Sequence, residues 1–226
     1  MEEYRFKPRR TVYLPFGLDP THLSVAQAGT SSARLRIGYL GQFAPHKGVH
    51  LLLAAFQKLV GPSQSCELIL HGHISDASPY ERRLLQTAKR DPNIAFAGPY
   101  PNQQVGQVLR SLDVIVVPSM WYENRPTVIV EAHATQTPVV ATRLGGMAEL
   151  IAHDENGLLF EAGSVQDLAK QLQRLLDEPA LLSQLRCGIQ PVPTVEEETA
   201  TLMRIYRSLL LPHRGQTVPN GALTVF

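Results

Sequence analysis

Two carboxylates, Glu123 and Glu131, lie eight residues apart in the stretch WYENRPTVIVEAH. A carboxylate accepts two hydrogen bonds at once and therefore suits a pair of sugar or ribose hydroxyls, which lysines and amides cannot bind as acceptors. Pro126 favours the first turn of a helix, so the amides of Thr127 and Val128 are expected to be free for an anion. The alternative is structural: Glu123 caps a helix and Glu131 pairs with a base at the surface.

A lysine and a glycine, Lys47 and Gly48, open a predicted helix in the stretch GQFAPHKGVH. A lysine and free backbone amides at a helix N-terminus form a good site for a phosphate oxygen. The spacing matches neither the GxxxxGK[ST] phosphate loop nor the GxGxxG dinucleotide fingerprint. Taken alone, Lys47 is better explained as a surface lysine. Gly145 and Gly146 favour the binding interpretation, because they let the backbone approach a ligand closely where another helix begins.

The histidines are not spaced as metal ligands. His46 and His50 stand four apart, and His71 and His73 flank a glycine. Zinc needs more ligands of the right kind at close spacing, and the sequence contains no DxD pair that could hold a divalent ion against a diphosphate. We therefore expect no metal, and any phosphate charge has to be met by lysine, arginine and amides.

From residue 34 onward, short β-rich runs alternate with runs of helical periodicity. Strands are predicted at 34–40, 66–72, 93–98, 113–119, 138–143 and 156–160. Helices are predicted at 48–60, 79–90, 102–112, 126–136, 147–151, 165–178 and 195–211. This alternation implies an α/β fold, a Rossmann-like doubly wound parallel sheet with helices on both faces. Such folds bind ligands at the carboxyl ends of the strands, where the turns described above lie.

The whole chain is predicted to be one domain with appendages. It has 226 residues, 44% of them apolar, and a formal net charge of +1, so nothing favours nucleic acid or an anionic membrane as a partner. Residues 11–23 are expected to form a strand remnant before a connector, and residues 212–226 to be disordered. The two cysteines suit a reduced compartment, and the segment MEEYRFKPRR resembles neither a signal peptide nor an anchor, so a cytoplasmic location is expected.

In their order along the chain, these motifs resemble the C-terminal, nucleotide-sugar-binding domain of a GT-B glycosyltransferase, specifically the retaining family 4 (glycosyl transferases group 1). The landmarks of that family are a G-[R]-x-x-x-x-K-G turn, an E-x7-E stretch ahead of a P-V-[IV]-[AG] strand, and a following G-G-x-x-E. Here they are GQFAPHKG, Glu123 to Glu131 followed by PVVAT, and GGMAE. The resemblance covers about residues 34–211.

The resemblance also implies an organisation of the chain. Residues 1–33 would be an interdomain linker and a remnant of the acceptor domain, and residues 34–190 the nucleotide-sugar-binding domain. Residues 191–211 would form a C-terminal crossover helix, followed by the tail 212–226. Family members pair two Rossmann-like domains, and here the acceptor domain is expected to be missing. The chain should then bind its donor without transferring sugar efficiently, because it lacks the second wall that excludes water.

Roles for individual residues follow from the resemblance. Lys47 would neutralise the donor diphosphate, Glu131 would bind the nucleotide ribose, and Glu123 would contact hydroxyls of the transferred sugar without acting as a nucleophile. The remaining residues expected to line the donor site are Gly41, Gln42, Gly48, Asn124, Thr127, Val128, Gly145 and Gly146. Lys47 and Glu123 are the expected catalytic residues, since charge already in place stabilises the negative charge that grows on the leaving diphosphate. Neither a cofactor nor a metal is implied.

One residue departs from the family pattern. Gln42 stands where the family commonly has arginine, so one charge directed at the phosphates is missing and Lys47 has to neutralise more of their charge.

The base of the nucleotide would be recognised by the loops near His73 and Tyr100.

The sequence as a whole predicts the donor-binding half of a retaining, hexosyltransferase-like enzyme of polysaccharide or glycoconjugate biosynthesis. It would transfer a sugar from a nucleotide-diphosphate sugar to a glycan, lipid or small-molecule acceptor. Contact with a membrane is expected only peripherally and only through the full-length enzyme. The alternative is a non-catalytic nucleotide-sugar-binding or interaction module. A relative that epimerises or phosphorolyses sugars fits the general fold, but the E-x7-E stretch with the flanking glycines argues against it.

Overall fold

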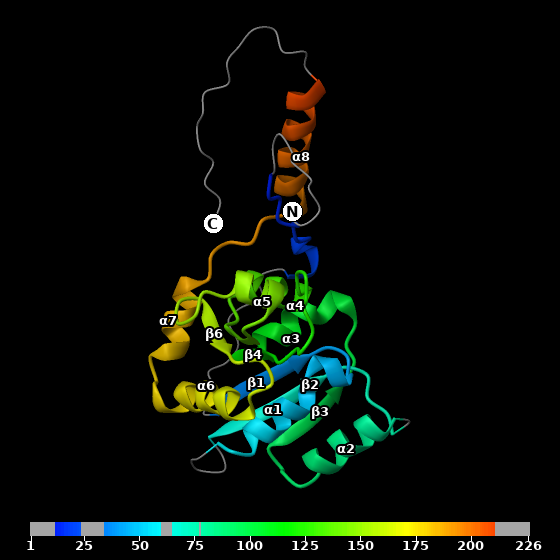
Figure 1. Ribbon diagram of the computed structural model, residues 1–226, viewed down its shortest axis with the longest axis vertical. Helices are drawn as coiled ribbons and strands as arrows, with labels where there is room; N and C mark the ends of the chain where they lie inside the picture. The colour runs from blue at the N-terminus through cyan, green and yellow to red at the C-terminus, as the bar shows by residue number, and fades with distance from the viewer. Residues whose placement is uncertain (1–11, 24–33, 60–64, 77, 211–226) are drawn as a thin grey trace, which may run out of the picture. The chain divides into compact units, whose positions relative to one another are not determined.

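The computed structural model describes residues 12–23, 34–59, 65–76 and 78–210 (Figure 1). The chain divides into two compact units. The larger is Pro20–Val192, and the described part of the smaller combines residues 12–19 with residues 193–210. The larger unit contains the sheet and every residue expected to bind the donor.

Six parallel strands form the sheet of the larger unit, in the order β3-β2-β1-β4-β5-β6. They are β1 Leu35–Leu40, β2 Cys66–His71, β3 Ile94–Gly98, β4 Val114–Val117, β5 Val139–Thr142 and β6 Gly157–Phe160. All six were predicted from the sequence. The strand order reverses between β1 and β4, which makes this the switch point where doubly wound folds bind ligands.

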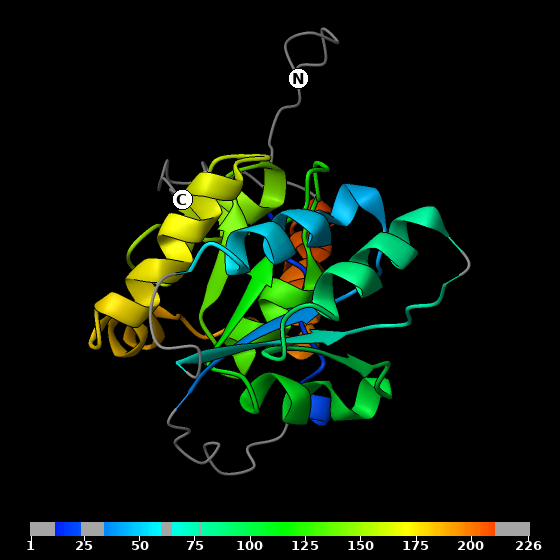
Figure 2. The same cartoon turned by 90° about the horizontal axis from the view of Figure 1, so that it is seen from below.

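Helices cover both faces of the sheet. The α-helices of the larger unit are α1 Val49–Phe56, α2 Pro79–Ala88, α3 Val105–Arg110, α4 Thr127–Ala134, α5 Gly145–Leu150, α6 Val165–Asp177 and α7 Leu181–Gly188. Short 3-10 turns are η2 Pro20–Leu23, η3 Pro45–Lys47 and η4 Asn102–Gln104. Figure 2 shows α1, α2 and α6 on one side of the sheet and α3 on the other, and α4 packs against α3. The predicted fold class, a Rossmann-like doubly wound α/β sheet, is confirmed.

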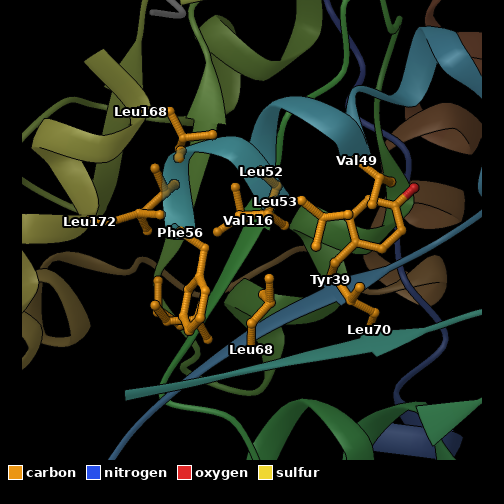
Figure 3. Close-up of a cluster of buried hydrophobic side chains, with 14 of the residues drawn as sticks. Tyr39, Val49, Leu52, Leu53, Phe56, Leu68, Leu70, Val116, Leu168 and Leu172 are labelled. Carbon is orange, nitrogen blue, oxygen red and sulfur yellow. The ribbon is translucent and has the colours of Figure 1, made fainter. Parts of the chain in front are cut away.

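A hydrophobic cluster fixes α1 against the sheet and against α6 (Figure 3). From α1, Leu52, Leu53 and Phe56 are at most 5% exposed. The labelled members from other elements are Tyr39, Leu68, Leu70, Val116, Leu168 and Leu172. Full burial of one such aliphatic side chain contributes about 1.5–3 kcal/mol. Lys47 lies in the turn directly before α1, so this burial also holds the position of Lys47.

Two parts of the larger unit and its flank differ from expectation. Helix α7 was not predicted, because Pro179 directly follows the helix predicted at 165–178 and disfavours further helix. Leu181 and Leu185, four residues apart, are both buried on α7. The strand remnant predicted at 11–23 is wrong for the described residues 12–23, which contain an isolated bridge from Leu18 to Thr194 and then η2. A strand needs a neighbouring strand along its length, and Leu18 finds one only at a single residue. The connector at 24–33 and the tail at 212–226 lie outside the described residues.

The smaller unit is built on the long helix α8, Val195–Leu210, as predicted. A capping box begins it: the Thr194 amide donates to the Glu197 carboxylate at 2.9 Å, and the Glu197 amide donates to the Thr194 hydroxyl at 3.3 Å. Glu198 accepts a 2.7 Å hydrogen bond from the Gly17 amide. No residue of α8 is buried, so its apolar side chains have no core in the described structure.

Candidate functional site

The turn after β1 and the loop after β4 meet at the switch point of the sheet. The Met120 amide donates to the His46 carbonyl at 2.8 Å, which binds the loop to the turn. Gly48 has φ +71°, and a Cβ atom there would lie 1.9 Å from the Pro118 carbonyl oxygen. Only glycine combines this backbone conformation with so close an approach. Gly48 is therefore required for the two segments to touch.

Lys47 and Glu123 form an ion pair across this junction. The Lys47 Nζ atom lies 2.5 Å from Glu123 Oε1, with side-chain exposures of 30% and 19%. Ser119 donates to the same carboxylate oxygen at 3.0 Å. Both charged residues were expected at the site, but their pairing was not. The structure thus brings the two expected catalytic residues into direct contact.

Glu131 has a different environment from Glu123. It is half-buried on α4, and its carboxylate makes no hydrogen bond or ion pair with any residue that the structure describes. Burial raises the pKa of this carboxyl above its ordinary value. Tyr100 follows β3, and burial, with a smaller effect of the nearby Glu131 charge, raises the Tyr100 pKa to about 12. Tyr100 also packs edge-on against His71, with ring centroids 5.6 Å apart.

The start of α4 provides the predicted backbone donors. Pro126 is its N-cap residue, and the Ile129 amide donates to the Pro126 carbonyl at 3.1 Å. The amides of Thr127 and Val128 belong to the first turn, where an α-helix has no internal acceptor for them. Thr127 and the neighbouring Asn124 are exposed. This turn lies at the carboxyl end of β4 and can receive an anion.

Gly145 and Gly146 contact the loop that carries Glu123. The Gly146 amide donates to the Glu123 carbonyl at 2.8 Å. A Cβ atom at Gly146 would lie 1.8 Å from the Asn124 carbonyl oxygen, and Gly145 has φ +52°. These glycines let the Glu123 loop pack onto the start of α5. They position Glu123, and the Gly146 amide is already engaged in doing so.

The two remaining predicted residues lie in the turn after β1. The Gly41 amide continues the sheet by donating to the His71 carbonyl at 3.0 Å. Gln42 is exposed, and its carbonyl accepts a 2.6 Å hydrogen bond from the buried Tyr39 hydroxyl. Tyr39 therefore fixes the turn beneath Gln42, while the Gln42 side chain faces solvent.

Three polar residues near the site were missed by sequence reasoning. Ser119 holds Glu123, as described above, and stands at the end of an apolar strand where a polar residue is a usable signal. Arg125, between Glu123 and α4, has a buried Nη1 atom without a hydrogen-bond partner among the described residues. The hydroxyl of Thr142, at the end of β5, is buried and likewise unpartnered there. No sequence pattern distinguished Arg125 or Thr142 from ordinary polar residues.

The described residues contain no group of three histidine, cysteine, aspartate or glutamate side chains that could hold a metal ion. Within the same residues, no helix is long and apolar enough to cross a membrane.

Fold and site together define a doubly wound α/β domain whose switch point has an ion pair, helix amides in a first turn, and a carboxylate without a partner among the described residues. Residues 25–188 match the family model described as glycosyl transferases group 1, and the chain belongs to that family. The resemblance drawn from the motifs is thereby confirmed at the level of this group.

Individual relatives agree with this assignment. A 2-deoxystreptamine glucosyltransferase from Streptomyces kanamyceticus is 28% identical over 186 residues, covering 77% of this chain and 48% of that protein. A D-inositol 3-phosphate glycosyltransferase from Corynebacterium jeikeium is 33% identical over 195 residues, covering 82% and 46%. The structure of sucrose-phosphate synthase from Thermosynechococcus elongatus superposes with a TM-score of 0.73 and 26% identity, covering 87% of this chain and 52% of that one. The chain thus spans about half the length of the relatives it matches.

Proposed function

We propose that this chain is the donor-binding half of a retaining, metal-independent GT-B glycosyltransferase of family 4, and that it binds a nucleotide-diphosphate sugar at the switch point of its sheet. The observation that carries the proposal is the contact between Lys47 and Glu123, a cation and a carboxylate brought together at 2.5 Å by two loops at the carboxyl ends of the strands. Membership of the glycosyl transferases group 1 family supports it.

In this proposal Lys47 and the first amides of α4 bind the diphosphate. Negative charge grows on the diphosphate as the anomeric bond breaks, and a cation already in place stabilises that transition state more than the ground state. The half-buried Glu131 has no partner among the described residues, so it is free to accept hydrogen bonds from the ribose hydroxyls. Tyr100 packs against His71 at the end of β2, so a nucleoside beside these rings would lie over the ends of β2 and β3.

Glu123 binds the transferred sugar rather than attacking it. Its Oε1 atom already accepts hydrogen bonds from Lys47 and Ser119, and a carboxylate held by a cation is a weaker nucleophile. Its remaining acceptor positions suit sugar hydroxyls. Retention would then come from attack of the acceptor on the same face of the sugar from which the diphosphate leaves.

The acceptor site belongs to a second domain in this proposal. The chain matches about half the length of its relatives, and α8 presents exposed apolar side chains, including Tyr206 at 51% and Leu209 at 71%. We propose that residues 1–33 and 191–211 connect the donor domain, residues 34–190, to that acceptor domain. The acceptor would be a glycan, a lipid or a small molecule.

The test is calorimetric titration of the chain with UDP, GDP and ADP. Saturable binding of one nucleotide, with at least tenfold preference over the others, is expected and names the base. Failure of the folded chain to bind any of the three nucleotides would overturn the proposal that it carries a donor site. The titrations need no added metal, and an absolute requirement for a divalent ion would contradict metal independence.

A further inference from the structure

A groove of about 610 Å³ lies between α1 and α2, outside the residues proposed to bind the donor. Its volume falls in the range of about 300–1,000 Å³ that is typical of small-molecule sites. Pro45 and Met120 form part of its lining. Pro45 belongs to the same 3-10 turn as Lys47, and Met120 to the same loop as Glu123, so the groove adjoins the proposed donor site.

The floor of the groove is apolar and rigid. Leu53 of α1 and Leu84 of α2 line it, with exposures of 1% and 2%, and both belong to the hydrophobic core. Ala54 lies beside them in the lining and leaves room because its side chain is small. Met120, 40% exposed, adds a flexible apolar side chain. A ligand in this groove therefore has an apolar portion.

One full charge accompanies this apolar surface. Among the described residues that line the groove, Arg83 carries a charge and none is a carboxylate. Arg83 is exposed on α2, and its guanidinium makes no hydrogen bond or ion pair with another residue that the structure describes. The nearby acid Glu81, outside the lining, is bound by Ser75 and Ser78, each at 3.1 Å. An arginine without an acidic partner at an apolar groove favours an anionic group on the ligand.

A hydrogen-bonded pair keeps the two helices at a fixed separation. The His50 Nδ1 atom of α1 lies 3.0 Å from the Tyr80 hydroxyl of α2, and their rings meet edge-on with centroids 5.7 Å apart. Both residues line the groove. Since the floor and this pair are already in place, binding does not include the free-energy cost of opening the groove.

We propose that this groove binds a single-chain anionic amphiphile, with its apolar chain on Leu53, Ala54 and Leu84 and its anionic group at Arg83. The site is separate from the proposed donor site, so it does not depend on that assignment. Because Pro45 and Met120 belong to segments that also carry Lys47 and Glu123, the bound amphiphile lies beside the donor site.

Calorimetric titration with decyl phosphate, kept below its critical micelle concentration, tests the proposal. Saturable binding at one site is expected. Arg83→Glu should weaken it at least tenfold, and Ala54→Phe, which fills the groove, should abolish it. Arg90→Glu makes the same charge change outside the lining and should alter the affinity less than twofold. Trp121 is the single tryptophan of the sequence and follows Met120, so its fluorescence should change in parallel.

Two further controls distinguish the groove from the donor site and from nonspecific binding of an alkyl chain. Decyltrimethylammonium, with the opposite charge, should bind at least tenfold more weakly than decyl phosphate. Lys47→Ala should leave the binding of decyl phosphate unchanged, because Lys47 lies in the donor site. Arg83 is exposed, so the Arg83→Glu variant is expected to fold. Circular dichroism checks that the Ala54→Phe variant also folds. Absence of binding, or binding that neither groove variant weakens, would overturn the proposal.

Discussion

At the scale of single residues, the Glu123 carboxylate competes with a bound diphosphate for Lys47. A diphosphate that binds Lys47 has to draw it from a carboxylate 2.5 Å away. Both side chains remain partly exposed, so the pair is expected to contribute only about 0.2–1 kcal/mol to folding. Its main consequence is therefore for ligand binding rather than for stability.

The Glu123→Gln variant should affect the binding of the diphosphate and of the sugar differently. We expect the affinity for the nucleoside diphosphate to stay the same or to rise a few-fold, because Lys47 loses its competitor. The affinity for the corresponding nucleotide sugar should fall relative to the diphosphate, because a carboxylate that binds sugar hydroxyls is lost. Calorimetry with both ligands measures this, and Glu155→Gln, at an exposed position in the turn before β6, is the control. Equal weakening of both ligands would contradict the assignment of Glu123 to the sugar.

Gly48→Ala tests the junction that brings these residues together. The new Cβ would lie 1.9 Å from the Pro118 carbonyl oxygen, at φ +71°. We expect the free energy of unfolding to fall by about 3 kcal/mol or more, from backbone strain and displacement of the loop. Gly163→Ala is the matched control, since Gly163 has φ +75° but no described residue apart from its chain neighbours lies within 4 Å of its Cβ position. It should cost about 1–2 kcal/mol, and urea unfolding that gives equal losses would contradict the steric account.

At the scale of elements, α4 illustrates what the sequence could and could not predict. Its residues TVIVEAHA include several β-branched side chains, yet Pro126 at the start and the run from Glu131 to Ala134 identified a helix. Ser164 caps α6, and its hydroxyl accepts from the Asp167 amide at 3.1 Å, so a serine directly before the helix predicted at 165–178 is a local signal of the same kind. Local signals of this kind were sufficient for the sheet and most of the helices.

Contacts between distant segments were not predictable. Lys47 and Glu123 were chosen separately, and nothing in their spacing indicated that they pair. Their contact depends on the approach of two loops at Gly48 and on Gly146, whose amide holds the Glu123 carbonyl. The same limit explains Arg125, whose buried guanidinium nitrogen is visible only in three dimensions.

His133 makes the stability of α4 depend on pH. It is 7% exposed, its Nε2 atom has no partner among the described residues, and burial lowers its pKa to about 4. The pKa of His133 in the folded chain lies below its ordinary value near 6.5. Between pH 4 and pH 6.5 the unfolded chain therefore binds a proton at His133 more tightly than the folded chain does. Stability is therefore lost as the pH falls from about 6.5 towards 4, by about 2 kcal/mol between pH 7 and pH 5.

The His133→Leu variant should remove this contribution. Urea unfolding at pH 7 and pH 5 should show a smaller loss of stability in the variant than in the parent chain. A residual slope is expected from His50 and His71, since burial lowers the pKa of both. An unchanged difference between the two pH values would show that His133 does not titrate as its burial implies.

At the scale of the whole molecule, α8 should make the isolated chain associate with itself. Met203, Tyr206, Leu209 and Leu210 are 45–82% exposed on this helix. Apolar side chains gathered on one element are a surface for association. Sedimentation velocity should show a mass that rises with concentration, and Tyr206→Ser combined with Leu209→Ser should reduce the rise. A single 25.0 kDa species at every concentration would contradict this.

In the proposed function, one site on this chain binds the ribose with Glu131 and the diphosphate with Lys47. Calorimetric titration with the preferred nucleoside diphosphate and with its nucleoside, for the parent chain, Lys47→Ala and Glu131→Ala, tests it most directly. Lys47→Ala should weaken the diphosphate about tenfold or more and leave the nucleoside unchanged, because a charge-assisted hydrogen bond contributes about 1.5–3 kcal/mol. Glu131→Ala should weaken both ligands. Binding that neither substitution changes would place the nucleotide elsewhere and contradict the account.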